Sequence, residues 1–329
     1  MEKTDFASIV PKIKVWETKL LNKSFYDKLI DMGSYEEAIK LLHESSYNDY
    51  NLNENYELNL ENLYKEVCED LNKTMKHTDV IKFVCLKNDY NNIKALIKGR
   101  ILSEDFASIL NKNGTVDLKV IKLAFKNDNF RELEPIMVEC INESIGSYES
   151  YYDPQRVDII VDKYMFKHMR NIAIDMESKF TLKYMEILID LTNIKTLLRS
   201  KRINKDKYFL KEVLLENGGL PTNLFLDNLS STFEEIPNKF LRTSYYKLIS
   251  DSINEYLTSN SLNALEKNID NYIMKFVKDA KFISFGVEPI FAYLYAREIE
   301  NKNLRIVLAG KENNVDSSII KERLRDNYV

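Results

Sequence analysis

The stretch FGVEPIFAYLYAREIENKNLRIVLAGK, from Phe285 to Lys311, determines which class of fold this chain can adopt. A glycine and a proline open a run that is apolar nearly all round a helical wheel, and charged residues form a collar further along it. Proline suits the first turn of a helix, because the N–H that it lacks would have no helical acceptor there. A helix that is apolar on most faces must be buried. The stretch therefore predicts a helix that is enclosed by its neighbours.

Two further helices are predicted after the Asp-Pro pair at 153–154. Apolar residues with the i, i+3, i+4, i+7 spacing of one helix face run over 157–172, and a second such run covers 184–198. Thr181 precedes the second run, and we expect it to cap that helix. Because β-branched clusters lie inside helical periods and strand-like alternation is scarce, the chain is predicted to be all-α with little or no sheet.

A shorter helix is predicted to begin after Ser34. Ser34 and Glu37 have the spacing of a capping box, in which the hydroxyl and the carboxylate each accept from a free backbone N–H. The chain has only 8 Gly and 6 Pro, too few for the turns of a sandwich or a barrel. This composition also favours long helices.

The composition also limits which classes of function are expected. The 329 residues are 44% hydrophobic and 30% charged, which is typical of a folded soluble protein, and the formal net charge is −4. An acidic chain lacks the basic surface that a nucleic-acid backbone requires, so no nucleic-acid partner is expected. No apolar run approaches the roughly 18 residues of a spanning helix, so we expect no membrane insertion. Three cysteines without CxxC spacing suit reduced thiols in a cytoplasm.

Three segments repeat one pattern, in which an asparagine, an aliphatic residue and a basic residue precede an apolar run that ends in another basic residue. The segments begin at Asn92, Asn193 and Asn303. A Lys/Asn/Ile-rich composition is the competing explanation, because it makes any helical sequence look self-similar. Intervals of roughly 80 to 110 residues are too long for tetratricopeptide or HEAT units. We predict one domain over residues 1–329 with three internal repeats, whose junctions lie near Lys19, Arg100, Arg202 and Lys311.

Asn113-Gly114 and Gly218-Gly219 interrupt helix-rich sequence at similar offsets in two of the repeats, and Gly33 lies at a comparable position in the first. Glycine adopts positive backbone φ without a steric penalty, so we expect both pairs to form positive-φ turns.

No constellation for catalysis or for a cofactor is visible. His43, His77 and His168 are far apart without metal-ligand spacing, and neither glycine-based phosphate-binding fingerprint occurs. His168 lies on the apolar face of the predicted 157–172 helix, so we interpret it as a core residue. The sequence therefore predicts a protein that is not an enzyme and has no cofactor and no metal site.

The segment 285–311, with IIKERL at 319–324, resembles the C-terminal signature of the C subunit of bacterial and archaeal V-type (A-type) ATP synthases, which is related to the d subunit of eukaryotic V-ATPases. Residues 19–21 and 34–42, followed by Ser46 and Tyr47, are similar to the opening helices of that family. Between about residues 48 and 284 the resemblance is one of pattern rather than of motifs.

This resemblance implies a funnel-shaped assembly of three pseudo-threefold-related three-helix bundles. It also implies a non-catalytic rotor subunit of the central stalk, peripheral at the cytoplasmic face of the membrane, that couples ATP synthesis or hydrolysis to proton or sodium transport. The implied partners are the D and F subunits of the stalk and the membrane ring of c/K subunits, with the A3B3 head reached indirectly. The signature residues, with a structural role and as a candidate interface, are Phe285, Gly286, Glu288, Pro289, Asn303, Arg305, Gly310 and Lys311.

Within this signature we expect Gly286 and Pro289 to set a turn that Phe285, Ile290 and Phe291 pack. A rotor subunit assembles from soluble parts, so we also expect a polar cavity and rim whose docking is sensitive to salt. A basic run is either a partner surface or a solvated helix end that complements the helix dipole. The run consists of Lys195, Arg199, Lys201, Arg202, Lys205 and Lys207.

Two other classes of protein remain open. An α-helical adaptor without rotary partners would have an exposed apolar groove, and an unrecognised all-α enzyme would have a deep pocket with perturbed titratable groups. A rotor subunit needs neither feature. The coupling ion and the direction of coupling are not encoded in this chain, because the ion ligands of such a machine lie in the ring.

Overall fold

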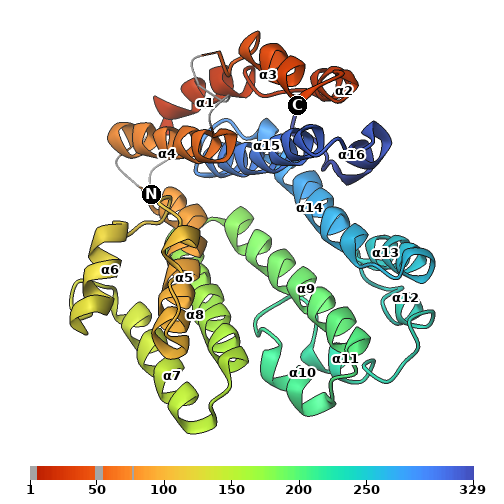
Figure 1. Ribbon diagram of the computed structural model, residues 1–329. Helices are drawn as coiled ribbons and strands as arrows, with labels where there is room; N and C mark the ends of the chain where they lie inside the picture. Colours follow the sequence, from red (N-terminus) through yellow and green to blue (C-terminus); the bar gives the residue numbers. More distant parts are fainter. Residues whose placement is uncertain (1–5, 49–54, 76–77) are drawn as a thin grey trace.

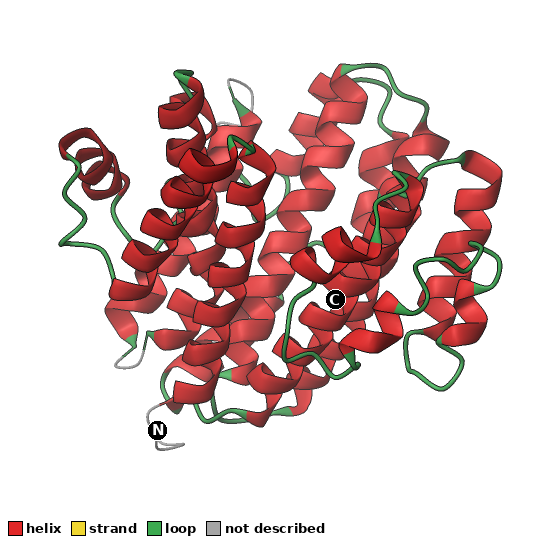
Figure 2. Ribbon diagram, turned by 90° about the horizontal axis from the view of Figure 1, so that it is seen from below, coloured by secondary structure: helices red, strands yellow, loops and turns green. Residues whose placement is uncertain are grey.

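The computed structural model describes residues 6–48, 55–75 and 78–329, and these residues form helices and loops without a strand (Figure 2). The predicted all-α class is therefore confirmed for the described chain. The α-helices are α1 (Ile9–Glu17), α2 (Lys23–Asp31), α3 (Tyr35–His43), α4 (Tyr56–Thr74), α5 (Asp79–Leu102), α6 (Leu118–Asn127), α7 (Pro135–Tyr151), α8 (Pro154–Asp175), α9 (Lys179–Arg202), α10 (Lys207–Val213), α11 (Thr222–Leu226), α12 (Ile236–Lys239), α13 (Tyr246–Ser259), α14 (Asn263–Lys278), α15 (Glu288–Glu312) and α16 (Ser317–Arg323). Two short 3-10 helices, η2 (Ala107–Ile109) and η3 (Asp279–Phe282), complete them. His77 lies outside the described residues.

The helices form three groups around a centre (Figure 1). Helices α1 to α4 lie with α15 and α16, α5 to α8 form a second group, and α9 to α14 form a third. A separate hydrophobic cluster joins side chains of α2, α3 and α4 to those of α15 and α16, so the last helices pack on the first. Residues 304–320 and 21–63 meet in this cluster although they are far apart in sequence.

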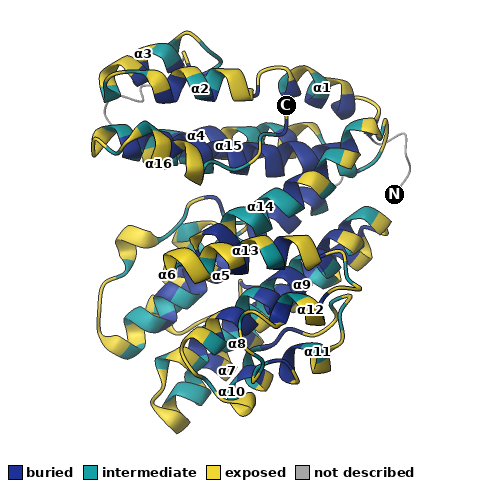
Figure 3. Ribbon diagram, turned by 90° about the vertical axis from the view of Figure 1, so that its right-hand side faces the viewer, coloured by how far each residue is buried: buried dark blue, intermediate teal, exposed yellow. Residues whose placement is uncertain are grey.

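Three long helices meet at the core. The rings of Phe83 on α5, Tyr184 on α9 and Phe291 on α15 contact one another, with centroids 5.9, 5.8 and 4.6 Å apart. Phe83 and Phe291 are at most 2% exposed. Aromatic side chains bury large apolar areas, and these edge-on and tilted arrangements are favourable, so this contact ties the three groups together. Figure 3 shows buried residues along α9 and α15.

The predicted helix starts are confirmed in two cases and displaced in one. The Asp153 side chain accepts from Gln155 N–H at the start of α8, and the Ser34 hydroxyl accepts from Glu37 N–H at the start of α3. Helix α9, however, is capped by Ser178 instead of Thr181, and Thr181 donates its own N–H to the Ser178 hydroxyl. The expected Thr181 cap is thus wrong by three residues.

The expectation of positive φ at Asn113-Gly114 and Gly218-Gly219 is also wrong, and at the second turn the positive φ, 66°, falls on Asn217 instead. Gly286 is the glycine with positive φ among the described residues, at 120°. At Gly114 and Gly218 an added Cβ would lie 2.1 Å from Asp89 Oδ1 and 2.4 Å from Asp190 Oδ1. Glycine is needed there because a buried carboxylate approaches the backbone, and not because of the backbone angle.

Candidate functional site

The turn before α15 is built from signature residues. Gly286 adopts a φ of 120°, and a Cβ there would lie 2.2 Å from Glu288 Oε2. Pro289 lies in the first turn of α15. Ser178, the cap of α9, donates its hydroxyl to Glu288 Oε1 at 2.9 Å. The turn therefore fixes the start of α15 against the start of α9.

The packing predicted around this turn is correct for two of three residues. Ile290 and Phe291 are at most 2% exposed, whereas Phe285 is 51% exposed. Phe285 precedes the positive-φ residue Gly286 and does not pack the turn. Phe285 is thus an exposed aromatic residue at the edge of the signature.

The signature residue Asn303 forms a hydrogen-bonded clamp. Its side-chain amide donates to Arg325 C=O at 3.0 Å and accepts from Arg325 N–H at 2.9 Å. Asn92 does the same with the backbone of Asn111, at 2.8 Å in both directions. Asn193 does so with Leu215, at 2.9 Å in both directions. The three repeated asparagines therefore make one kind of contact, each to the segment that follows its long helix.

A buried acid precedes each of these asparagines by three residues, a relationship not recognised from the sequence. Asp89 accepts from the N–H groups of Thr115 and Val116 at 2.8 and 3.1 Å. Asp190 accepts from Leu220 N–H and the Tyr245 hydroxyl, both at 2.9 Å. Burial raises the pKa of both carboxyls above their ordinary values. These acids hold the glycine-containing segments against the long helices.

Glu300 is the acid at the third position and reaches the beginning of the chain. It accepts from Leu21 N–H at 2.6 Å and from the Tyr47 hydroxyl at 2.7 Å. Arg297 lies 2.6 Å from the same carboxylate, and both side chains are less than a tenth exposed. Burial raises the pKa of Glu300 against the opposing effect of Arg297. A buried pair of this kind is costly to break, because removing one partner leaves an uncompensated charge.

The remaining signature residues lie along α15 and at its far end. Arg305 contacts Glu61 on α4 at 3.4 Å, and Lys311 donates to Met32 C=O at 2.7 Å. At Gly310 an added Cβ would lie 2.6 Å from Ile320 of α16. The rise of 1.5 Å per residue separates Pro289 from Gly310 by about 32 Å. The eight residues therefore do not converge on one site, and all of them except the exposed Phe285 lie in the turn before α15 or connect α15 to its neighbours.

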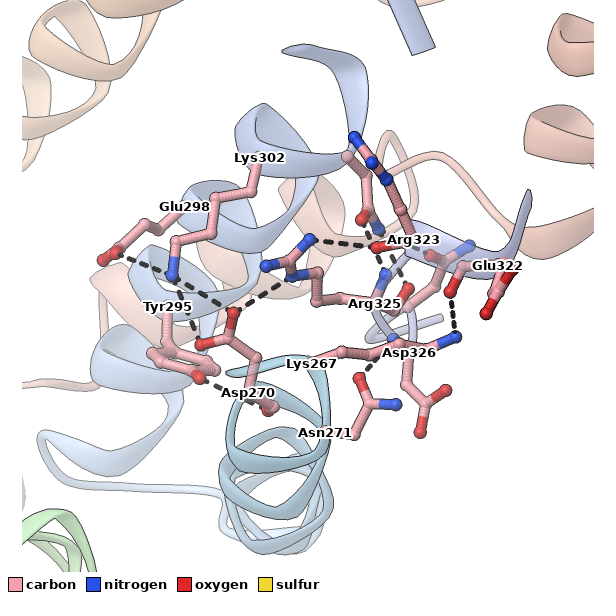
Figure 4. A network of polar contacts seen from close by, with 12 residues as sticks. Lys267, Asp270, Asn271, Tyr295, Glu298, Lys302, Glu322, Arg323, Arg325 and Asp326 are labelled. Carbon is pink, nitrogen blue, oxygen red and sulfur yellow. Dashed lines mark hydrogen bonds and ion pairs between the residues drawn. The ribbon is translucent and has the colours of Figure 1, made fainter. Parts of the chain in front are cut away.

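A polar network joins α14 and α15 to the residues after α16. Asp270 forms ion pairs with Lys302, at 3.3 Å, and with Arg325 Nε, at 3.1 Å (Figure 4). Asp326 N–H donates to the Asn271 side chain in the same network, at 2.8 Å. The network holds the C-terminal segment on the outside of these two helices.

The predicted basic run does not form one continuous surface. Arg199 pairs with Glu266 on α14 at 2.5 Å, whereas Lys207 pairs with Asp227 at 2.9 Å. Lys201 donates to Leu229 C=O at 3.1 Å. Residues of the run thus face two different neighbours.

His168 is a core residue, as predicted. It is 4% exposed, and its Nδ1 lies 3.1 Å from the Tyr90 hydroxyl while its Nε2 lies 3.2 Å from Glu134. Burial lowers its pKa, against the opposing charge of Glu134.

An open cleft of about 1050 Å³ lies between α4, α5 and the 112–122 segment. Its lining contains both lysines and carboxylates, and Lys82 and Glu134 in it are 2.9 Å apart. No group of three or more His, Cys, Asp or Glu that could hold a metal ion occurs among the described residues. Within the same residues no helix is long and apolar enough to cross a membrane. Cys68, Cys85 and Cys140 are buried free thiols.

The fold and the contacts together define an all-α protein in which each of three long helices carries a buried acid and, three residues later, an asparagine clamp. A family model described as ATP synthase (C/AC39) subunit matches residues 9–323, and the chain belongs to this family. It is 25% identical over 327 residues to the C subunit of the V-type sodium ATPase of Enterococcus hirae, covering 98% of this chain and 99% of the relative. It is 24% identical over 346 aligned positions to the C subunit of the A-type ATP synthase of Methanocaldococcus jannaschii, covering 97% and 86%.

Proposed function

We propose that this chain is a non-catalytic rotor subunit of a V/A-type ATP synthase or ATPase. In this role it couples the D–F stalk to the membrane ring of c/K subunits, so that rotation links ATP synthesis or hydrolysis to proton or sodium transport. The observation that carries the proposal is the match of residues 9–323 to the C/AC39 family. The relatives named above are likewise C subunits of V-type and A-type complexes.

The internal architecture supports a mechanical role. Torque transmission requires a body that does not deform, and close helix packing provides stiffness. The clamps of Asn92, Asn193 and Asn303 each bind both backbone groups of one residue, and the aromatic contact among α5, α9 and α15 joins the three groups. We propose that the chain is one domain of three pseudo-threefold repeats arranged as a funnel, with junctions near Lys19, Arg100, Arg202 and Lys311.

The proposed location is the cytoplasmic face of the membrane, where the chain is peripheral and touches D and F on one side and the ring on the other. The A3B3 head is reached only through the stalk. For seven signature residues we propose a structural role, because each lies in the turn before α15 or contacts a neighbouring element. Phe285 is the exposed member, and for it we propose contact with a partner.

A pull-down of the tagged full chain from native membranes at low salt tests the proposal, with bound proteins identified by mass spectrometry. We expect to recover D, F and ring subunits together with A and B. A bait that carries the tag alone is the control. Recovery of unrelated soluble proteins without any ATPase component would exclude the rotor role and favour an adaptor.

The same experiment at rising ionic strength tests the nature of the contacts. Polar interfaces between exposed charges weaken when salt screens them, over a Debye length of roughly 8 Å at physiological ionic strength. We expect D and F to be released progressively. Retention that does not change with salt would show that the contacts are apolar.

A further inference from the structure

Ion pairs join two long helices within a group, at equivalent positions in the second and third groups. Counting from the repeated asparagine, Lys94 and Lys98 of α5 lie two and six residues beyond Asn92. Lys94 Nζ is 2.6 Å from Asp162 and Lys98 Nζ is 2.7 Å from Asp158, both on α8. In this contact between α5 and α8, each lysine pairs with a different carboxylate.

The corresponding contact between α9 and α14 has only one of these two ion pairs. Arg199 lies six residues beyond Asn193 and pairs with Glu266 at 2.5 Å, as Lys98 pairs with Asp158. Asp270 follows Glu266 by four residues, as Asp162 follows Asp158, so it is the expected partner of Lys195. Asp270 instead binds Lys302 and Arg325 at 3.3 and 3.1 Å (Figure 4).

Lys195 is consequently left without an ion pair to any residue that the structure describes. Its side chain is half-buried on α9. Burial, with the nearby Arg199, lowers its pKa against the opposing charges of Glu266, Asp270 and Asp162. A cation in this setting gains more from an anionic ligand than a fully hydrated surface lysine does, because part of its hydration is already lost.

Lys195 faces an open pocket of about 390 Å³ where α9, α14, α15 and the C-terminal segment meet. Four cations and two carboxylates line this pocket, so its lining carries an excess of positive charge. Arg305 contributes a guanidinium whose contact with Glu61 is loose, at 3.4 Å, which leaves donors available. The lining residues are Lys195, Glu266, Ile269, Asp270, Lys302, Arg305, Ile306 and Arg325.

We propose that this pocket binds a phosphate group, with Lys195 and Arg305 as its principal ligands. A guanidinium presents paired N–H donors that match two phosphate oxygens, and an ammonium adds a point charge. The pocket is wider than a single phosphate ion. The phosphate group that it binds can therefore belong to a nucleotide, to a lipid head group or to free inorganic phosphate. The site is independent of the rotor role, since binding is a property of the isolated chain.

Isothermal titration calorimetry of the full chain tests the site. The probes are inorganic phosphate, ATP, and phosphatidylcholine vesicles with and without phosphatidylglycerol, and the probe that binds identifies the source of the phosphate. We expect one site on the wild-type chain, and a rise in Kd of roughly tenfold or more in Lys195→Gln, because a charged contact is lost. Lys183→Gln is the matched control, since Lys183 is an exposed lysine of α9 that pairs with Glu186.

The Tm of each variant is measured in parallel. Lys195→Gln removes an unpaired charge and is expected to keep the wild-type Tm; if it unfolds, Arg305→Gln replaces it as the test variant with the same expected rise in Kd. Failure of inorganic phosphate, ATP and both kinds of vesicle to bind the wild-type chain overturns the proposal. Binding that is equal in the wild-type, Lys195→Gln and Arg305→Gln chains also overturns it.

Discussion

Phe285 and Phe291 are the same residue type six positions apart, yet their environments differ. Phe291 lies in the ring contact of the three long helices, and Phe285 is half-exposed. Truncating a buried phenylalanine costs about 3–5 kcal/mol, because transfer free energy is lost and a cavity remains. We expect Phe291→Ala to lower the free energy of unfolding by that amount in urea titrations and Phe285→Ala to change it by less than about 0.5 kcal/mol. Equal losses would place Phe285 in the core.

The titration of His168 is expected to make the stability of the fold depend on pH. Burial lowers its pKa below the ordinary 6.5, while Glu134 opposes and Lys82 adds to the decrease. The unfolded chain therefore binds a proton at higher pH than the folded chain does. Stability is unaffected by this group above the unfolded pKa and falls as the pH drops from about 6.5 through the lowered value.

The wild-type chain and His168→Gln can be compared by urea unfolding from about pH 8 to about pH 5. The other titrating groups, including the buried acids, are common to both proteins, so the difference isolates the histidine. We expect the wild-type chain to lose stability relative to the variant as the pH falls. A constant difference would show that the pKa of His168 is not lowered.

At the scale of one element, each asparagine clamp satisfies two backbone groups. Asn193→Ala would leave Leu215 N–H and C=O without these partners, and each stranded group costs about 1–3 kcal/mol. We expect amide exchange at Leu215 to speed up by at least roughly tenfold, together with a lower Tm. Asn223→Ala, at an exposed position of α11, is the control and is expected to change neither quantity. Unchanged protection at Leu215 in Asn193→Ala would mean that the clamp does not hold this segment.

The elements also show what the sequence could and could not predict. The start of α8 was predictable because Asp153, Pro154 and the apolar face lie in one local stretch. The cap of α9 was not, since Ser178 and Thr181 are both good caps and the choice depends on Glu288, which is 110 residues away. Repetition of Asn92, Asn193 and Asn303 was visible, but the acids three residues earlier were overlooked because Glu300 differs from Asp89 and Asp190 in length.

In the whole molecule, contacts between distant segments were not predictable from the sequence, for a physical reason. Glu300 binds Leu21 across 279 residues, and no local pattern marks such a pair. Asp270 pairs with Lys302 and Arg325, whereas Lys195 forms no ion pair with a described residue. Charge patterns in one chain identify the groups that can pair, whereas the packed structure decides which pairs form.

The turn at Gly286 tests whether the signature acts through the whole fold or through a partner. It positions the start of α15, where the three long helices meet. Gly286→Val combines a φ of 120° with a Cβ that would lie 2.2 Å from Glu288 Oε2, so we expect a loss of about 1–3 kcal/mol or more and a lower Tm. Gly146→Val is the matched control, because open space surrounds Gly146 on α7 and valine is a slightly better helix former than glycine.

Binding of D and F to Gly286→Val is then measured at a temperature where the variant is folded. If the turn is structural, the folded fraction binds with wild-type affinity, because the interface itself is unaltered. A Gly286→Val protein with the wild-type Tm that does not bind D, F or the ring would instead make the turn part of an interface. In that case the exposed Phe285 beside it would be the first residue to replace, since its loss costs little stability and any effect on assembly reports a direct contact.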